Sequence, residues 1–206
     1  MIRFYRTPRL TRYLYSSLTW TIQSSDSIFL TFDDGPDPEV TPWVLDQLNS
    51  VSAKATFFCL GRNIDQHPQL MQQIVAQGHQ IGNHTYSHMK GWRSKDSSYC
   101  EDVSLCDEVM MEHNLKSDLF RPPYGRIKKS QIKKLRDKRI IMWSHLSWDF
   151  DDKLSINKSI SQLKKAKPGS VLVFHDSQKA FNNLQVILPE ILSHFQAKGF
   201  KFEALL

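Results

Sequence analysis

The chain has 206 residues, 40% of them hydrophobic, which predicts one globular domain with a single core. Its net charge of +6 is modest, and many of the basic residues lie in segments that read as amphipathic surface helices. Because no nucleic-acid-binding motif accompanies this charge, we expect no nucleic-acid partner. The three cysteines, Cys59, Cys100 and Cys106, form no CxxC pair and argue against a disulfide framework or a thiolate zinc site.

The N-terminal segment carries arginines at positions 3, 6, 9 and 12 but no apolar run of signal-peptide length behind them. No membrane span is visible either. We therefore expect a cytoplasmic protein, with association with the membrane surface or the cell envelope as the alternative. Pro8 and the strand-like segment after it favour an N-terminal extension, residues 1–25, packed on a domain formed by residues 26–206.

Short apolar segments alternate with amphipathic ones along the rest of the chain. We predict strands over 27–33, 54–60, 79–83, 118–121, 139–143, 171–175 and 199–203. We predict helices over 39–50, 64–77, 96–114, 128–137, 157–166 and 180–197. This order indicates a mostly parallel sheet wrapped by helices, either open and doubly wound or barrel-like, with functional sites at the carboxyl ends of its strands. A complete eight-stranded barrel typically needs about 250 residues.

Two adjacent carboxylates, Asp33 and Asp34, follow the first predicted strand, and Gly35 and Pro36 end that strand. One acid could hold a metal ion while the other acts as a base. Taken alone, the pair could also be an Asx turn or a helix cap, which would need only one of the two residues.

Two histidines, His84 and His88, follow the third predicted strand and are spaced so that both can reach one ion. With Asp34 they would form a set of two histidines and one carboxylate, which leaves coordination positions open for water and substrate. The alternative is a pair of exposed or capping histidines.

Three later segments supply further candidate residues. In the first of them, Arg121 is followed by two prolines and then by Tyr124 and Gly125, which indicates a stiff turn after a predicted strand. Such a turn could place the arginine side chain beside a carboxylate and point a backbone N–H at an oxyanion. The other two segments supply Asp149 and His175. A carboxylate beside this histidine would keep it protonated, as a general acid requires. A solvated loop arginine and a structural histidine are the alternatives.

Together, these five segments resemble the five motifs of the polysaccharide deacetylase family, the NodB-homology group of carbohydrate esterases, in order and spacing from about residue 26 to 203. The resemblance implies an α/β fold, an incomplete, distorted (β/α) barrel of about seven parallel strands in a single domain. It also implies a catalytic domain over 26–206 that hydrolyses acetyl groups from N-acetylated sugars such as peptidoglycan or chitooligosaccharide. The cofactor implied is a divalent metal, most often zinc, with cobalt, manganese and nickel as alternatives.

The same resemblance assigns roles to residues. It makes Asp34, His84 and His88 the metal ligands. It makes Asp33 the base, Arg121 the partner of that base, His175 the acid and Asp149 the residue that tunes the acid. The Tyr124 N–H becomes an oxyanion donor, and the substrate-binding residues implied are Tyr124, Trp148 and Leu172.

The chain departs from the family pattern in the fourth motif. Leu146 stands where the family often has an aspartate, and Phe150 stands where it often has a tryptophan. Both changes bear on the sugar-binding surface rather than on proton transfer. Two alternative functions remain at this stage: hydrolysis of a non-sugar amide or imide by the same scaffold, and glycan binding without catalysis.

Overall fold

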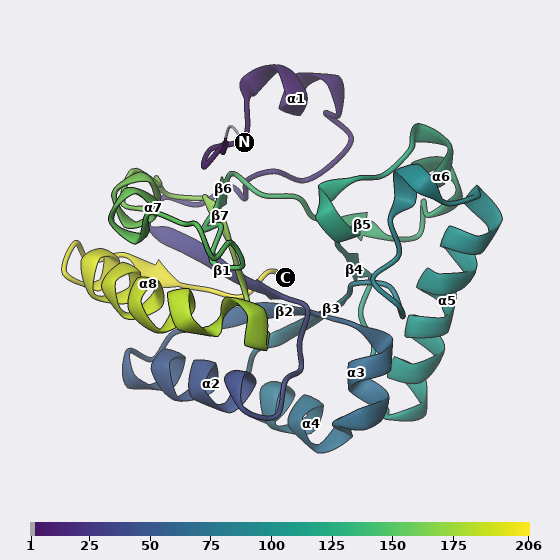
Figure 1. Cartoon of the computed structure of the whole chain (residues 1–206), viewed down its shortest axis with the longest axis horizontal. Helices are drawn as coiled ribbons and strands as arrows, with labels where there is room; N and C mark the ends of the chain where they lie inside the picture. Colours follow the sequence, from purple (N-terminus) through teal and green to yellow (C-terminus); the bar gives the residue numbers. More distant parts are fainter. Residues whose placement is uncertain (1–2) are drawn as a thin grey trace.

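In the computed structural model, residues 3–206 are described, and parallel strands form a curved sheet with helices packed outside it (Figure 1). Seven strands form a continuous path in the order β5-β4-β3-β2-β1-β7-β6, and β8 pairs with the start of β1. The strands are β1 (Ser27–Asp33), β2 (Ala55–Cys59), β3 (Gln80–Asn83), β4 (Leu119–Phe120), β5 (Arg139–Ile140), β6 (His145–Leu146), β7 (Val171–His175) and β8 (Lys201–Phe202). The incomplete barrel of about seven parallel strands in one domain is thus confirmed.

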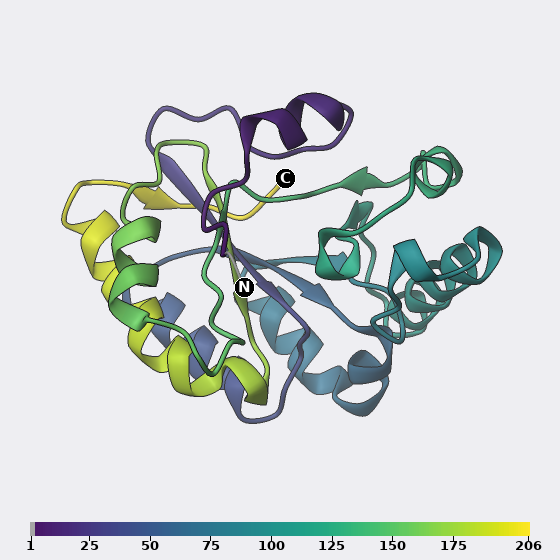
Figure 2. The same ribbon diagram turned by 45° about the horizontal axis from the view of Figure 1, so that its top comes forward.

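Most helices follow a strand, as the alternating pattern predicts, and Figure 2 shows them around the outside of the sheet. They are α1 (Arg9–Leu14), α2 (Val40–Ser50), α3 (Gly61–Gln66), α4 (Pro68–Ala76), α5 (Asp96–Glu112), α6 (Lys129–Lys134), α7 (Ile156–Leu163) and α8 (Gln178–Gln196). None of the described helices is both long enough and apolar enough to span a bilayer.

The central strand β1 is buried along its whole length. Such a continuous buried run is expected for a parallel strand that is covered on both faces. Phe32 stacks between Phe57 of β2 and Phe174 of β7, with ring centroids 5.1 and 5.7 Å away. This aromatic layer lies one residue before the carboxyl ends of β1 and β7, so it supports the strand ends from which the polar residues emerge.

Several elements differ from their predictions for local reasons. The helix predicted over 64–77 is divided into α3 and α4 because Pro68 begins a new helix and disfavours helical backbone at His67, whose φ and ψ are −135° and 52°. The strand-like segment expected after Pro8 is the short helix α1. No strand is predicted at β6, because His145 and Leu146 lie between Ser144 and Ser147 and no apolar run marks the segment.

The N-terminal segment lies along the connection between β5 and β6, the two end strands of the sheet path. Thr19 forms a bridge with Ile141, and Arg6 forms one with His145. Backbone hydrogen bonds from Met142 to Thr19 and from Leu146 to Tyr5 reinforce these contacts at 2.7 and 2.9 Å. The segment therefore covers the sheet where the barrel is incomplete.

Candidate metal and catalytic site

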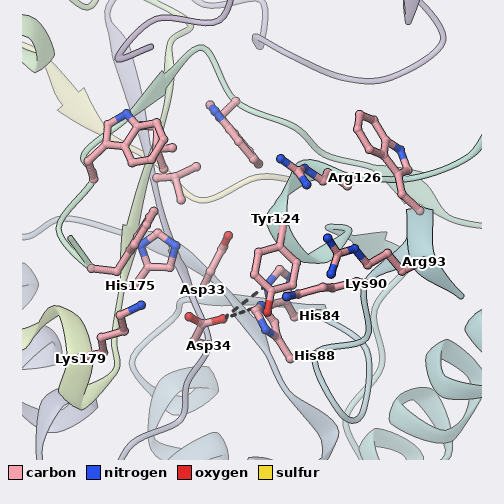
Figure 3. Close-up of a pocket in the computed structure, with 16 residues that line it drawn as sticks. Asp33, Asp34, His84, His88, Lys90, Arg93, Tyr124, Arg126, His175 and Lys179 are labelled. Carbon is pink, nitrogen blue, oxygen red and sulfur yellow. Dashed lines mark ion pairs between the residues drawn. The ribbon is translucent and has the colours of Figure 1, made fainter. Parts of the chain in front are cut away.

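Strand register brings the polar motifs together at the carboxyl edge of the sheet. In the parallel pairing of β1 with β7, Asp33 is the register partner of His175. In the pairing of β3 with β4, Asn83 is the partner of Phe120, so the next residues, His84 and Arg121, also become neighbours. Of these residues, Asp33, His84 and His175 line one cavity of about 770 Å³ (Figure 3), whereas Arg121 is fully buried.

Asp34, His84 and His88 offer one ligand atom each, all within 4.8 Å of one another. Oδ1 of Asp34 lies 3.6 Å from Nε2 of His84 and 3.2 Å from Nε2 of His88. Burial opposes ionisation of Asp34, but the approach of His88 and the charge of His175 outweigh burial and hold the pKa of this carboxyl below its usual range. An ionised carboxylate facing two imidazoles is a set of ligands suited to a divalent metal.

The tautomer of His84 supports this interpretation. Its Nδ1 lies 2.7 Å from the carbonyl oxygen of Arg121, which can only accept a hydrogen bond, so Nδ1 carries the proton. Burial lowers the pKa of His84 to about 4, and the ring is therefore neutral near pH 7. Its Nε2 then presents a lone pair toward Oδ1 of Asp34, a buried oxygen that has no hydrogen-bond donor among the described residues. Two facing electron pairs repel each other unless a cation lies between them, so these residues fit a metal ion.

Asp33, the other carboxylate of the adjacent pair, contacts Arg121 rather than the histidines. Its Oδ1 accepts a 2.7 Å hydrogen bond from Nη1 of Arg121, which is fully buried. The guanidinium also donates to the carbonyl oxygens of Ile141 and Met142 and to the hydroxyl of Thr31. Each arm of the guanidinium is fixed by a separate partner, so the orientation of Asp33 is fixed as well.

Asp149 binds His175 at two points. Its Oδ1 lies 2.7 Å from Nδ1 of the imidazole, and its Oδ2 accepts a 2.9 Å hydrogen bond from the backbone N–H of His175. Burial alone would lower the pKa of His175, but the charge and hydrogen bond of Asp149 raise it to about 9. The ring is thus protonated at neutral pH and can donate a proton from Nε2.

Tyr124 has left-handed backbone, with φ of 61°. The amides after it, those of Gly125 and Arg126, donate to the carbonyls of Pro122 and Pro123, whereas within residues 3–206 no carbonyl accepts from the Tyr124 amide. Its ring is half exposed and lies 4.5 Å from the ring of His88. The Tyr124 amide is therefore without a hydrogen-bond acceptor in the described part of the chain.

Left-handed backbone is concentrated at this site. Seven non-glycine residues in the described chain have positive φ, and five of them belong to the site motifs: Asp34, Thr85, His88, Tyr124 and Trp148. Such conformations are costly for residues with a Cβ and persist where surrounding structure enforces them, most often at functional sites. The strain is consistent with a site that requires exact placement of these side chains.

The substrate-binding residues inferred from the sequence separate in the structure. Trp148 and Tyr124 line the cavity, whereas Leu172 does not. Leu172 is fully buried in the core, and because strand side chains alternate, its neighbour Val173 faces the cavity instead. The expectation for Leu172 is corrected accordingly. Leu146 and Phe150, the two departures in the fourth motif, also line the cavity and make this wall apolar.

Sequence reasoning missed several residues that line the cavity, because most of them stand on loops without a motif, while Val173 lies within β7 and Lys179 within α8. They are Lys90, Trp92, Arg93, Arg126, Trp143, Val173 and Lys179. An exposed tryptophan between basic residues, at 90–93, was the one local signal that could have indicated part of this group.

Comparisons with known proteins agree with this geometry. The sequence profile of the polysaccharide deacetylase family matches residues 22–142. A peptidoglycan-N-acetylglucosamine deacetylase of Bacillus cereus is 33% identical over 90% of this chain and 89% of its own length. A chitooligosaccharide deacetylase of Azorhizobium caulinodans is 34% identical over 75% of each chain.

Similarity extends to solved structures. A crystal structure of a peptidoglycan N-acetylglucosamine deacetylase in complex with an N-oxidanyl-benzamide compound superposes with a TM-score of 0.83 and 30% identity. That match covers 97% of this chain and 95% of the other. The chain belongs to the polysaccharide deacetylase family.

Proposed function

We propose that this protein is a metal-dependent hydrolase that removes acetyl groups from the amino sugars of an N-acetylglucosamine-containing glycan or oligosaccharide. The observation that carries the proposal is the presence, around one cavity, of a metal-ligand set, a carboxylate base and a protonated imidazole. Family relatives named as peptidoglycan and chitooligosaccharide deacetylases support the choice of substrate class.

Asp34, His84 and His88 would hold the metal, and a divalent ion bound there supplies Lewis acidity toward water and toward the acetyl carbonyl. Zinc suits two imidazoles and one carboxylate, although cobalt, manganese and nickel accept the same ligands. Because His84 donates its Nδ1 proton to the Arg121 carbonyl, its Nε2 remains free for the ion.

Proton transfer is divided between two protein groups. Asp33 takes a proton from the attacking water, and Arg121 keeps this carboxylate in one orientation through the 2.7 Å hydrogen bond. The Tyr124 amide donates to the acetyl oxygen as negative charge develops on it. His175 then gives its proton to the departing sugar nitrogen while Asp149 stabilises the imidazolium.

The test is release of acetate from a panel containing N-acetylglucosamine oligomers and peptidoglycan fragments. Protein loaded with zinc should release acetate. Treatment with a chelator should abolish this activity, and addition of zinc should then restore it. If no substrate in the panel yields chelator-sensitive acetate, the proposed function is wrong. A panel of simple amides and cyclic imides tests the alternative activity under the same conditions.

A further inference from the structure

The charged side chains at the mouth of the cavity are all basic. Apart from the carboxylates and histidines of the site, the charged residues lining it are Lys90, Arg93, Arg126 and Lys179. Figure 3 shows the first three gathered on the Tyr124 side, with Lys179 across the cavity beside His175. We call Lys90, Arg93 and Arg126 the basic rim.

The basic rim has no acidic partner. No carboxylate in residues 3–206 lies within ion-pair distance of any of its three side chains, all of which are exposed. Nearby lysines differ, since Lys128 pairs with Asp96 and Lys138 pairs with Asp107. Uncompensated charges of one sign at a cleft attract ligands of the opposite sign.

The loops that carry the basic rim are fixed to each other. Trp92 donates from its indole Nε1 to the carbonyl of Ile127 at 3.0 Å, and Gln131 donates to the carbonyl of Gly91 at 3.0 Å. A third bond, 2.6 Å long, joins Nζ of Lys128 to the carbonyl of Ser94. The loop over 90–94 and the loop over 124–128 therefore form one surface, whose rigidity lowers the entropy cost of binding.

Aromatic faces accompany the charges. Trp92 is 54% exposed although its indole is hydrogen bonded, and Tyr124 is 50% exposed. The guanidinium of Arg126 lies 5.1 Å from the centre of the Trp92 ring, and Nζ of Lys90 lies 4.8 Å from the centre of the Tyr124 ring. Flat apolar faces bordered by hydrogen-bond donors suit a sugar ring that bears an anionic substituent.

From this arrangement we infer that the preferred substrate is an acidic glycan, with a carboxylate or phosphate on the sugar that lies over the basic rim while the neighbouring N-acetyl group reaches Asp34, His84 and His88. This inference rests on the proposed function, and it distinguishes acidic glycans from neutral chitooligosaccharides. Arginine forms paired hydrogen bonds with either anion, so the rim chemistry is common to both.

The experiment compares four tetrasaccharides as substrates. One alternates N-acetylglucosamine with N-acetylmuramic acid, the second is its carboxyl methylamide, the third is neutral chitotetraose, and the fourth is chitotetraose carrying a phosphate monoester. We expect kcat/KM for the free carboxylate to exceed that for the methylamide by about tenfold, and the gap to narrow as salt is added. A still higher value for the phosphate ester would support the inference and assign the anion as phosphate.

The variant that tests the rim is Arg93→Gln combined with Arg126→Gln. In this variant, the ratio of kcat/KM for the free carboxylate to kcat/KM for the methylamide should fall to near one. The matched control is Arg9→Gln combined with Arg136→Gln, which removes the same charge from exposed positions outside the cavity lining and should keep the ratio. The inference would be overturned if the unaltered protein showed equal kcat/KM for acid and methylamide and no gain for the phosphate ester over neutral chitotetraose. An unchanged ratio of acid to methylamide in the rim variant would also overturn it.

A binding measurement separates this inference from the proposed function. Calorimetric titration of Asp33→Asn protein with the acid and the methylamide reports recognition without turnover. If no tetrasaccharide yields acetate, the proposed function fails, and the calorimetric preference still decides whether the rim binds acidic glycans. If acetate is released but neither titration nor turnover depends on the anion, the proposed function stands and the inference fails.

Discussion

The backbone carbonyl of Arg121 is hydrogen bonded to the imidazole of His84. The carbonyl oxygen of Arg121 accepts the Nδ1 proton of His84, while the guanidinium of the same residue holds Asp33. One residue thus orients a proposed metal ligand and the proposed base. Because the first contact uses the backbone and the second the side chain, substitution can separate them.

Arg121→Lys should therefore reduce turnover while leaving zinc bound. A lysine lacks the fork that reaches Asp33, Ile141 and Met142 together, so we expect kcat to fall on the order of a hundredfold. Buried carbonyls left without donors should lower the free energy of unfolding by about 1–3 kcal/mol. Metal analysis, kinetics and denaturant unfolding measure the three effects. A loss of zinc in this variant would contradict the separation of roles.

Asp33→Asn keeps the size of the side chain but removes its ability to take a proton. We expect the fold and the zinc content to be retained and kcat to fall by on the order of 10²- to 10⁴-fold. Acetate release and metal analysis on the same preparation provide the check. A variant with normal turnover would refute the assignment of Asp33 as the base.

His88→Ala should lose bound zinc, unlike Asp33→Asn, because it removes an imidazole from the proposed set of three metal ligands. We expect zinc affinity to fall by more than the roughly 10- to 100-fold loss that follows mutation of an outer partner of a metal ligand. Competition with a chromophoric chelator measures this affinity. His113→Ala, a histidine outside the cavity lining, is the matched control and should bind zinc normally. Equal affinities in the two variants would exclude His88 as a ligand.

The pair formed by His175 and Asp149 predicts a titration that NMR can follow in the metal-free protein. The imidazole of His175 should titrate near pH 9, and Asp149→Asn should bring its pKa down, since burial then acts without the opposing charge. A pKa for His175 that does not change on this substitution would show that Asp149 does not tune the ring.

The same pair links stability to pH. The pKa of His175 is about 9 in the folded protein and about 6.5 in the unfolded chain. Its stabilising contribution is therefore complete below about pH 6.5 and is lost as the pH rises through 9. Denaturant unfolding of the metal-free protein over that range should show a decline that Asp149→Asn reduces.

Gly35→Ala tests how closely the turn after Asp34 packs against Asp176. A Cβ at this position would collide with the carboxylate of Asp176, which is fully buried and accepts a 2.6 Å hydrogen bond from Thr41. We expect the substitution to cost about 1–3 kcal/mol of stability through overpacking. Thermal unfolding measures the cost. Combination with Asp176→Ser should recover part of it, and an unaltered midpoint in the single variant would contradict the packing.

The amino-acid sequence by itself predicted seven of the eight described strands, the helices from α2 onward, and the residues at most strand ends. Six candidate residues could be located because they lie at or just after the ends of apolar segments that local periodicity marks as strands. Asp33, Arg121 and His175 end such segments, Asp34 and His84 directly follow them, and His88 is four residues after His84. In a parallel sheet the carboxyl ends of strands share one edge, so these residues were expected to meet.

Tertiary structure decided what local patterns do not encode. The register between β1 and β7 made Asp33 and His175 partners, and the alternation of β7 placed Val173 rather than Leu172 at the cavity. The basic rim comes from two loops of ordinary composition, which follow the paired strands β3 and β4 and are joined by hydrogen bonds such as that from Trp92 to Ile127. A strand is specified by its own residues, whereas the charge around a cavity depends on which surface segments pack side by side.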